Sequence, residues 1–159
     1  MRRVFARGYF QHMNVTVAAA VSEADRALGR AIRHAVFVQE QAVPPEVELD
    51  GLDDEAEHFL ARVGREAIAT ARARSTARGW KIERVAVLRA ERRRSVGAAL
   101  VRRMLAQAPE GVTVYVHAQE GALGFWQHLG FVAQGDRFFE GGIAHRLMEW
   151  TERETLSAG

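Results

Sequence analysis

The chain has 159 residues, of which 48% are hydrophobic and 26% charged, and its net charge is +2 at pH 7. This length and composition fit one packed domain and exclude a disordered chain, because the apolar surface suffices to form a core. The small net charge argues against general nucleic-acid binding, and the absence of cysteine excludes disulfides, thiolate metal sites and cysteine nucleophiles.

The N-terminal part of the chain predicts a strand followed by a long helix. Residues 14–20 have a strand-like composition. Ser22 can cap a helix whose apolar side chains recur at helical spacing to about residue 39. Pro44 and Pro45 then prevent this helix from continuing.

An acidic segment and three predicted strands come next. Residues 46–57 are rich in acidic and turn-forming residues and predict a solvated loop. Residues 58–63 and 67–73 predict two strands joined by a short turn. Residues 82–88 are rich in β-branched side chains and predict a third strand.

Helical and strand-like patterns alternate in the second half of the chain. Residues 96–108 predict an amphipathic helix, residues 113–116 a strand and residues 122–129 a short helix. Residues 144–150 predict the final strand, after a turn at Gly141 and Gly142. The order of elements indicates a mixed sheet covered by helices, that is, an α/β or α+β fold.

The predicted domain covers residues 13–153, between an N-terminal extension at 1–12 and a C-terminal tail at 154–159. Polar residues interrupt any signal-like apolar run near the N-terminus, and no later apolar run has membrane-spanning length. We therefore expect a cytoplasmic protein that does not associate with membranes.

Three consecutive arginines, residues 92–94, stand before the predicted helix at 96–108. Positive side chains are unfavourable at a helix N-terminus, where unpaired N–H groups already carry positive charge, and a bound anion would resolve the conflict. The backbone amides of residues 93–98 could bind a pyrophosphate, and Gly97 would allow close approach. The alternatives are a solvated, arginine-rich helix start or a nucleic-acid-binding surface, but such surfaces need interleaved aromatic residues that are missing here.

The segment from Arg92 to Gly97 resembles the acyl-CoA-binding motif of the GNAT superfamily of N-acetyltransferases, Arg/Gln-x-x-Gly-x-Gly/Ala. Ser95 stands at the position of the first glycine. Residues 124–131 are similar to the Phe-Tyr-x-x-Leu-Gly-Phe segment of the same superfamily. Segments at 36–41, 117–119 and 142–148 resemble the ElaA/YjcF-like branch, so the resemblance extends over most of the chain.

This resemblance implies a GNAT fold, with a mixed central sheet of six or seven strands flanked by about four helices, and acetyl-CoA as co-substrate. It implies acetyl transfer to a primary amine of an unidentified small molecule or peptide, by direct attack in a ternary complex, and leaves a homodimer open. The cofactor-binding residues that it implies are Val85, Ala86, Val87, Arg92, Arg93, Arg94, Ser95, Val96, Gly97, Ala98, Gln119, Phe125 and Trp126. The alternative is a CoA-binding module with little or no turnover, because Ser95 and Trp126 depart from the usual motif residues.

Three residues are candidates for proton transfer. By the two-residue period of a strand, Glu83 shares a face with Val85 and Val87, where burial would raise the pKa of its carboxyl and make it a base. The alternative is a glutamate that merely pairs with a neighbouring arginine. Trp126 stands where the superfamily has a proton-donating tyrosine, so Tyr115 or His145 could replace it; otherwise they are a half-buried aromatic and a hydrogen-bonded core histidine.

The acidic segment could also bind a cationic acceptor amine. The residues expected to do so lie between the first helix and the second strand and are Glu40, Glu48, Asp50 and His58. The alternative is an ordinary solvated loop. Their spacing matches no standard calcium or zinc motif, so no metal is expected.

Overall fold

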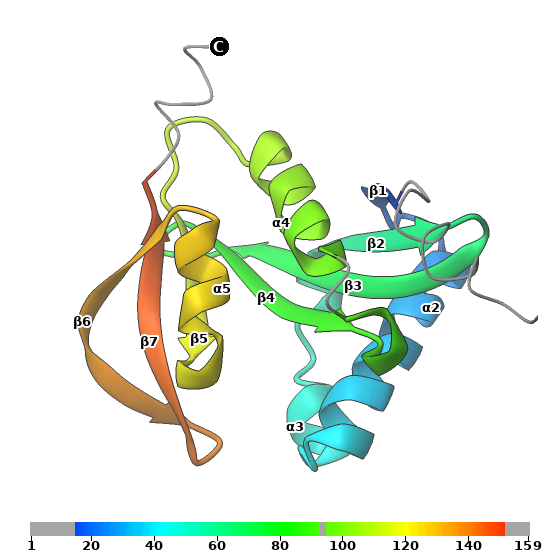
Figure 1. Ribbon diagram of the computed structural model, residues 1–159, viewed down its shortest axis with the longest axis horizontal. Coiled ribbons are helices and arrows are strands. Elements are labelled where there is room, and N and C mark those ends of the chain that lie inside the picture. The colour runs from blue at the N-terminus through cyan, green and yellow to red at the C-terminus, as the bar shows by residue number, and fades with distance from the viewer. Residues whose placement is uncertain (1–14, 93–94, 152–159) are drawn as a thin grey trace, which may run out of the picture.

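The computed structural model describes residues 15–92 and 95–151 (Figure 1). The predicted extension at 1–12, the predicted tail at 154–159, and Arg93 and Arg94 lie outside the described residues.

One mixed sheet of seven strands forms the centre of the molecule, in the order β1-β2-β3-β4-β5-β7-β6. Its β4–β5 pair is parallel, and its other neighbouring pairs are antiparallel. The predicted mixed α/β architecture is confirmed. The strands are β1 (Val15–Ala19), β2 (Glu57–Val63), β3 (Glu66–Ser75), β4 (Trp80–Val87), β5 (Val114–Gln119), β6 (Phe131–Glu140) and β7 (Ile143–Trp150).

Strand β6 was not among the strands located from the sequence. Its side chains are mostly exposed, and its register shifts between Gln134 and Phe138, next to Gly135, which has a φ of 70°. A strand without a buried face lacks the alternation of apolar and polar residues that marks other strands. Pairing with β7 therefore defines this strand more than its own composition does.

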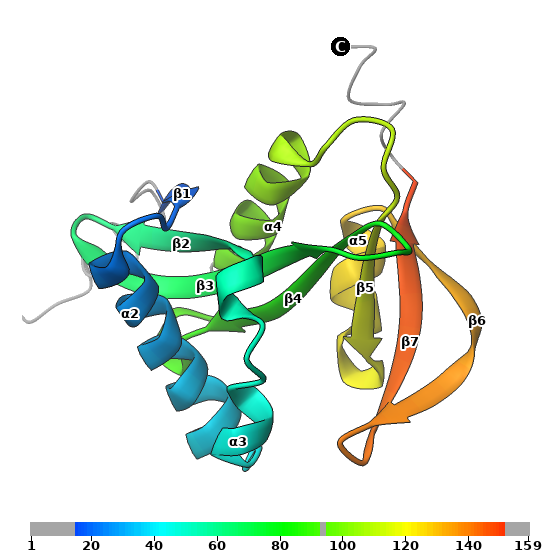
Figure 2. The ribbon, with the colours of Figure 1, turned by 180° about the vertical axis from the view of Figure 1, so that it is seen from behind.

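The helices cover both faces of the sheet, with α2 and α3 on one face and α4 and α5 on the other (Figures 1 and 2). The side chain of Ser22 accepts a hydrogen bond from the amide of Asp25, as expected for the cap of α2. Helix α2 continues directly into a π-helix, which ends before the two prolines. The helices are α2 (Glu23–Arg33), the π-helix η2 (His34–Glu40), α3 (Pro45–Glu48), α4 (Val96–Gln107) and α5 (Leu123–His128).

The main core lies between the sheet and α4. Val101, Met104 and Leu105 on this helix are buried against the strands, as the helical period predicts, and Leu100 is buried beside them. On the sheet side, Phe59 and Trp80 pack edge to face, with ring centroids 6.5 Å apart. This packing holds the N-terminus of α4 in a fixed position beside β4.

Strands β4 and β5 pair over a short stretch only. Their register joins residues 80–82 to residues 114–116, and beyond it the two strands diverge (Figure 1). Within the described residues, the later part of β4 therefore leaves its edge toward β5 without a neighbouring strand. This divergence creates the space in which the candidate site lies.

Candidate functional site

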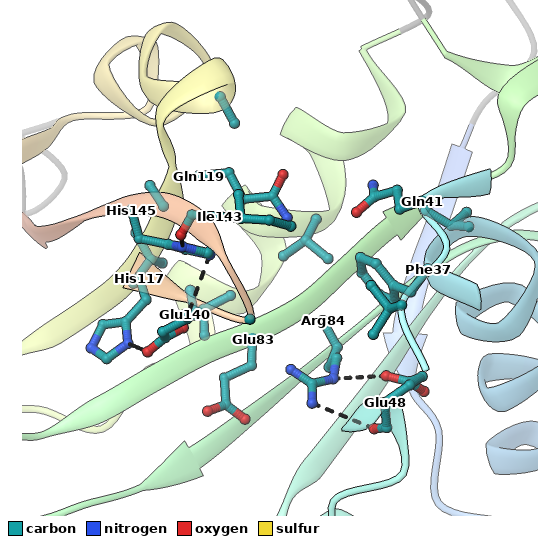
Figure 3. Close-up of a pocket in the computed structure, with 18 of the residues that line it drawn as sticks. Phe37, Gln41, Glu48, Glu83, Arg84, His117, Gln119, Glu140, Ile143 and His145 are labelled. Atoms are coloured by element: carbon teal, nitrogen blue, oxygen red, sulfur yellow. Dashed lines mark hydrogen bonds and ion pairs between the residues drawn. The ribbon is translucent and has the colours of Figure 1, made fainter. Parts of the chain in front are cut away.

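A cleft of about 920 Å³ lies between the diverging strands β4 and β5 (Figure 3). Residues 81–85 and Val87 line one wall, and residues 116–119 line the other. The π-helix contributes Phe37, and the end of β6 contributes Glu140. The cleft therefore takes residues from segments that are far apart in the chain.

The residue that precedes α4 has a backbone conformation that favours glycine. Ser95 has a φ of 58°, in the left-handed region that favours glycine, and its side chain does not cap the helix. A Cβ atom at Gly97 would lie 3.3 Å from Cε2 of Phe125 and 3.5 Å from Cγ2 of Val87. Gly97 therefore allows α4, α5 and β4 to approach closely beside the cleft.

Arg92 and Glu40 form a two-pronged ion pair, in which Nη1 and Nη2 of Arg92 each lie 2.9 Å from a carboxylate oxygen. The Nε group of Arg92 also donates to the carbonyl of Val87. From the sequence, Glu40 is expected at the acceptor and Arg92 at the cofactor. The structure instead brings these two residues together at the end of the cleft nearest α4.

The expected pantetheine residues divide between the two faces of β4. Val85 and Val87 line the cleft. Ala86 is buried on the opposite face, in a small core cluster with Ile32 and Leu60. Only its backbone can therefore contribute to a cofactor site on this side.

A β-bulge changes the orientation of Glu83 relative to these residues. Arg84 has a φ of 55°, and Ala71 of β3 faces both Arg84 and Val85, because Arg72 pairs with Glu83 and Thr70 with Ala86. The expectation that Glu83 shares a face with Val85 and Val87 is therefore wrong. The extra residue reverses the alternation, so Val85 lies on the face of Ile82.

Glu83 lies within hydrogen-bonding distance of three cations. Its carboxylate is 2.8 Å from Arg72, 2.8 Å from Arg74 and 3.0 Å from Lys81. Burial opposes its ionisation, but hydrogen bonds and charges from these cations outweigh burial and lower its pKa to about 2. The expectation that burial raises this pKa is wrong, and the role of Glu83 as a base stays a prediction.

The acidic segment is not a solvated loop throughout. Glu48 is only 4% exposed, and its carboxylate lies 2.7 Å from Arg33 and 2.8 Å from Arg84. Asp50 lies 2.6 Å from Arg72. The hydrogen bond and charge of Arg72 lower the pKa of Asp50 despite partial burial, which acts to raise it.

Together these groups form what we call the buried ion cluster. It contains four carboxylates and five cationic side chains, contributed by Glu48, Asp50, Asp53, Glu83, Arg33, Arg72, Arg74, Lys81 and Arg84. Nearby, Nε2 of His58 lies 2.8 Å from the carbonyl of Asp53, outside the cleft lining. The expected acceptor residues Glu48, Asp50 and His58 are thus engaged by neighbouring groups.

His145 lines the cleft, but Tyr115 does not. The hydroxyl of Tyr115 lies 2.6 Å from that of Thr76, and the ring is buried. Nδ1 of His145 lies 2.7 Å from the carbonyl oxygen of Ile143 and donates to it, because a carbonyl only accepts. The neutral imidazole therefore carries its lone pair on Nε2, 3.9 Å from a carboxylate oxygen of Glu140 (Figure 3).

His117 and Glu140 complete this corner of the cleft, and neither was among the predicted site residues. Nδ1 of His117 lies 2.6 Å from a carboxylate oxygen of Glu140. Burial, aided by the charge of Lys81, lowers the pKa of His117 despite the nearby carboxylate. The strand period places His117 on the face of Gln119, a predicted cofactor residue, and this was the available signal. Glu140 carries no such signal, because its position depends on β6.

The remaining cofactor candidates lie at the end of the cleft near α5. Gln119 ends β5 and reaches the cleft, and Phe125 and Trp126 line it from α5. Trp126 also packs edge to face on Phe131, with ring centroids 5.0 Å apart. The structure thus brings together Gln119, Phe125 and Trp126 with Val85 and Val87 from β4.

Among the described helices, each is too short or too polar to cross a membrane. Within residues 15–92 and 95–151, no group of three His, Asp or Glu side chains is arranged to hold a metal ion.

Comparisons with known proteins identify one family. Residues 18–152 match the model of the acetyltransferase (GNAT) domain. The chain is 32% identical to the uncharacterized N-acetyltransferase YjcF of Bacillus subtilis over 120 residues, which are 74% of this chain and 86% of YjcF. The crystal structure of Escherichia coli ElaA has a TM-score of 0.75 at 27% identity, covering 87% of this chain and 99% of ElaA.

A third similar structure contains a ligand. A GNAT family acetyltransferase from Elizabethkingia anophelis, solved with acetyl-CoA bound, has a TM-score of 0.67 at 15% identity. The alignment covers 86% of this chain and 97% of that chain. At this sequence identity, the comparison shows a shared fold.

Proposed function

Because the chain belongs to the GNAT acetyltransferase family, we propose that it transfers the acetyl group of acetyl-CoA to a primary amine by direct attack in a ternary complex. The observation that carries this proposal is the divergence of β4 from β5 after Ile82. It opens a cleft beside unpaired strand backbone and beside the N-terminus of α4.

The cleft offers hydrogen-bonding groups for two parts of CoA, the pantetheine and the diphosphate. The peptide groups of β4 beyond Ile82 are not used by β5 and can hydrogen-bond to the amides of pantetheine. The first amides of α4, including those of Val96, Gly97 and Ala98, can bind the diphosphate at the positive end of the helix dipole. Arg92 lines the cleft beside this helix start and can add a charge-assisted hydrogen bond to a phosphate.

His145 is our first candidate for the base that accepts a proton from the acceptor ammonium. Its Nε2 carries a lone pair in the neutral ring and lies in the cleft, near the carboxylate of Glu140. Glu140 can hold the ammonium before transfer and stabilise the imidazolium that forms. Glu83 is a second candidate, but a carboxyl with a pKa of about 2 is a weak proton acceptor at neutral pH.

The chemical step then requires no covalent enzyme intermediate. The neutral amine attacks the carbonyl carbon of the thioester, forming the C–N bond, and the C–S bond breaks to release the thiolate of CoA. The second proton of the attacking nitrogen passes to this thiolate or to solvent, which leaves a neutral amide. A backbone N–H of β4, such as that of Val85, can stabilise the oxyanion. The thiolate can leave unprotonated, because a thiol has a pKa of about 8.5. Trp126, at the usual tyrosine position, therefore need not supply a proton.

Calorimetric titration with acetyl-CoA tests the cofactor site. We expect binding by the wild-type protein and weaker binding by Arg92→Gln, by about tenfold, because a charge-assisted contact to phosphate is lost. Arg30→Gln is the matched control, since Arg30 is a similarly exposed arginine paired with a glutamate on α2. Binding without thiol release in a broad amine screen would favour a CoA-binding module, and no binding would overturn the assignment.

A further inference from the structure

The acceptor side of the cleft carries charges of opposite sign on its two walls. We propose, resting on the function above, that the acceptor is an amino carboxylate, whose carboxylate binds Arg84 while its amine faces Glu140 and His145. The charges and hydrogen bonds of these three residues carry the proposal.

The β4 wall has a surplus of positive charge. In the buried ion cluster, five cations face four carboxylates, which leaves one positive charge in excess. Arg84 and Lys81 are the cations of this cluster that line the cleft, and Arg84 is the more exposed, at 26% against 16% for Lys81. Arg33 and Arg72 are 2% and 1% exposed. The excess charge is therefore accessible to a ligand at Arg84.

The guanidinium of Arg84 is held in place but not saturated. Its Nε donates to Glu48 over 2.8 Å (Figure 3). Its Nη2 has longer contacts, including 3.3 Å to Asp50. Among the described residues, no hydrogen bond uses Nη1 of Arg84, so two N–H donors remain. The bulge at Arg84 fixes the backbone from which the side chain extends. A planar, prepositioned guanidinium of this kind suits a carboxylate.

The opposite wall is negative. Glu140 is 46% exposed, and its side-chain partners across the cleft corner are His117 and His145. Burial and the charge of Lys81 favour the neutral form of His117, so this histidine does not cancel the charge of Glu140. An ammonium group therefore finds a carboxylate at Glu140, next to the lone pair of His145.

These charges discriminate between classes of acceptor. Glu48 and Asp50 are paired with arginines, so they offer no net attraction for a second cationic group, as a polyamine would require. A plain monoamine would pair with Glu140, but it would cover the free N–H donors on Nη1 of Arg84 without offering them a hydrogen-bond acceptor. Leaving desolvated donors without an acceptor is unfavourable. A molecule with both an amine and a carboxylate satisfies both walls.

Matched acceptors test the proposal. Leucine, leucinamide and 3-methylbutylamine share one side chain, but only leucine has a carboxylate, which is an amide in leucinamide and absent from 3-methylbutylamine. The β- and γ-amino acids, each with its decarboxylated amine, vary the distance between the amine and the carboxylate. With acetyl-CoA and the full chain, we expect kcat/KM for at least one amino carboxylate to exceed that for its amide and its decarboxylated amine by about tenfold or more. Binding of each compound to the CoA-saturated protein is measured by calorimetry, so that a preference is detected even without turnover.

Variants assign that preference to Arg84. Arg84→Gln should raise the KM of the amino carboxylate, or weaken its binding, by about tenfold. The same quantity for the decarboxylated amine should change by less than about threefold. Arg62→Gln is the control, because Arg62 is equally exposed and ion-paired but lies on β2, away from the cleft. Arg84→Lys keeps the charge if Arg84→Gln fails to fold. The proposal would be overturned if the wild type used or bound the matched compounds equally, or if Arg84→Gln weakened the amino carboxylate and the decarboxylated amine equally. A wild-type protein that does not bind acetyl-CoA would instead overturn the proposed function.

Discussion

Nδ1 of His117 lies 2.6 Å from the carboxylate of Glu140, which ties β5 to the end of β6. This contact holds Glu140 in the cleft, within 3.9 Å of Nε2 of His145. The two histidines and the glutamate come from three strands. In the proposed function, the acceptor amine approaches the thioester beside these three residues.

His145→Gln should lower kcat by about a hundredfold, because the amide side chain cannot accept the proton of the ammonium. The affinity for acetyl-CoA, measured by calorimetry, should stay unchanged. His34→Gln, at an exposed position where the π-helix begins, is the control and should keep full activity. If Glu83→Gln lowers kcat more than His145→Gln does, the base is Glu83 instead.

Glu83 should make the stability of the fold depend on pH in the acid range. Its pKa falls from an ordinary 4.5 to about 2 on folding, so its contribution is fully present above pH 4.5 and is lost as pH falls toward 2. The shift corresponds to roughly 3 kcal/mol. Urea unfolding followed by circular dichroism between pH 2 and 7 measures it.

In Glu83→Gln, the unfolding free energy should be lower at pH 7 and should change less between pH 4.5 and 2 than in the wild type. Exposed Glu66, at the start of β3, provides the control variant Glu66→Gln. An unaltered acid slope in Glu83→Gln would contradict the pairing of Glu83 with its three cations.

Glu48→Gln should lower the unfolding free energy by about 3 kcal/mol, because it leaves buried Arg33 without one of its two carboxylate partners. Chemical denaturation at pH 7 measures the loss. Glu46→Gln removes the same charge from an exposed position of the same short helix and should cost less than about 0.5 kcal/mol. Equal effects of the two substitutions would show that Glu48 is not a buried partner of Arg33.

Ser95→Gly should stabilise the protein by roughly 0.5 kcal/mol, since glycine adopts the positive φ of this position without strain. Thermal unfolding is the measurement, and acetyl-CoA affinity should be retained. Ser95→Ala keeps the Cβ atom and should give no such gain. A gain with alanine would mean that the hydroxyl, not the backbone conformation, is unfavourable.

Local sequence patterns were sufficient to predict most of the secondary structure. Ser22 caps α2 as predicted, and the helical period placed Val101 and Met104 in the core. The motif around Gly97 led to the GNAT family, which the comparisons confirm. These features depend on residues within a few positions of one another, so they can be predicted from the sequence alone.

The bulge at Arg84 and the partners of the charged residues depended on the tertiary structure. One extra residue in β4 moved Glu83 to the face opposite Val85, and arginines from α2, β3 and β4 neutralised the acidic segment. Pairing of β6 with β7 brought Glu140 to His145. Sequence thus determined the elements and the family, whereas the pKa values and charge balance of the site follow from long-range contacts, because electrostatic energy depends on distance in space and on burial.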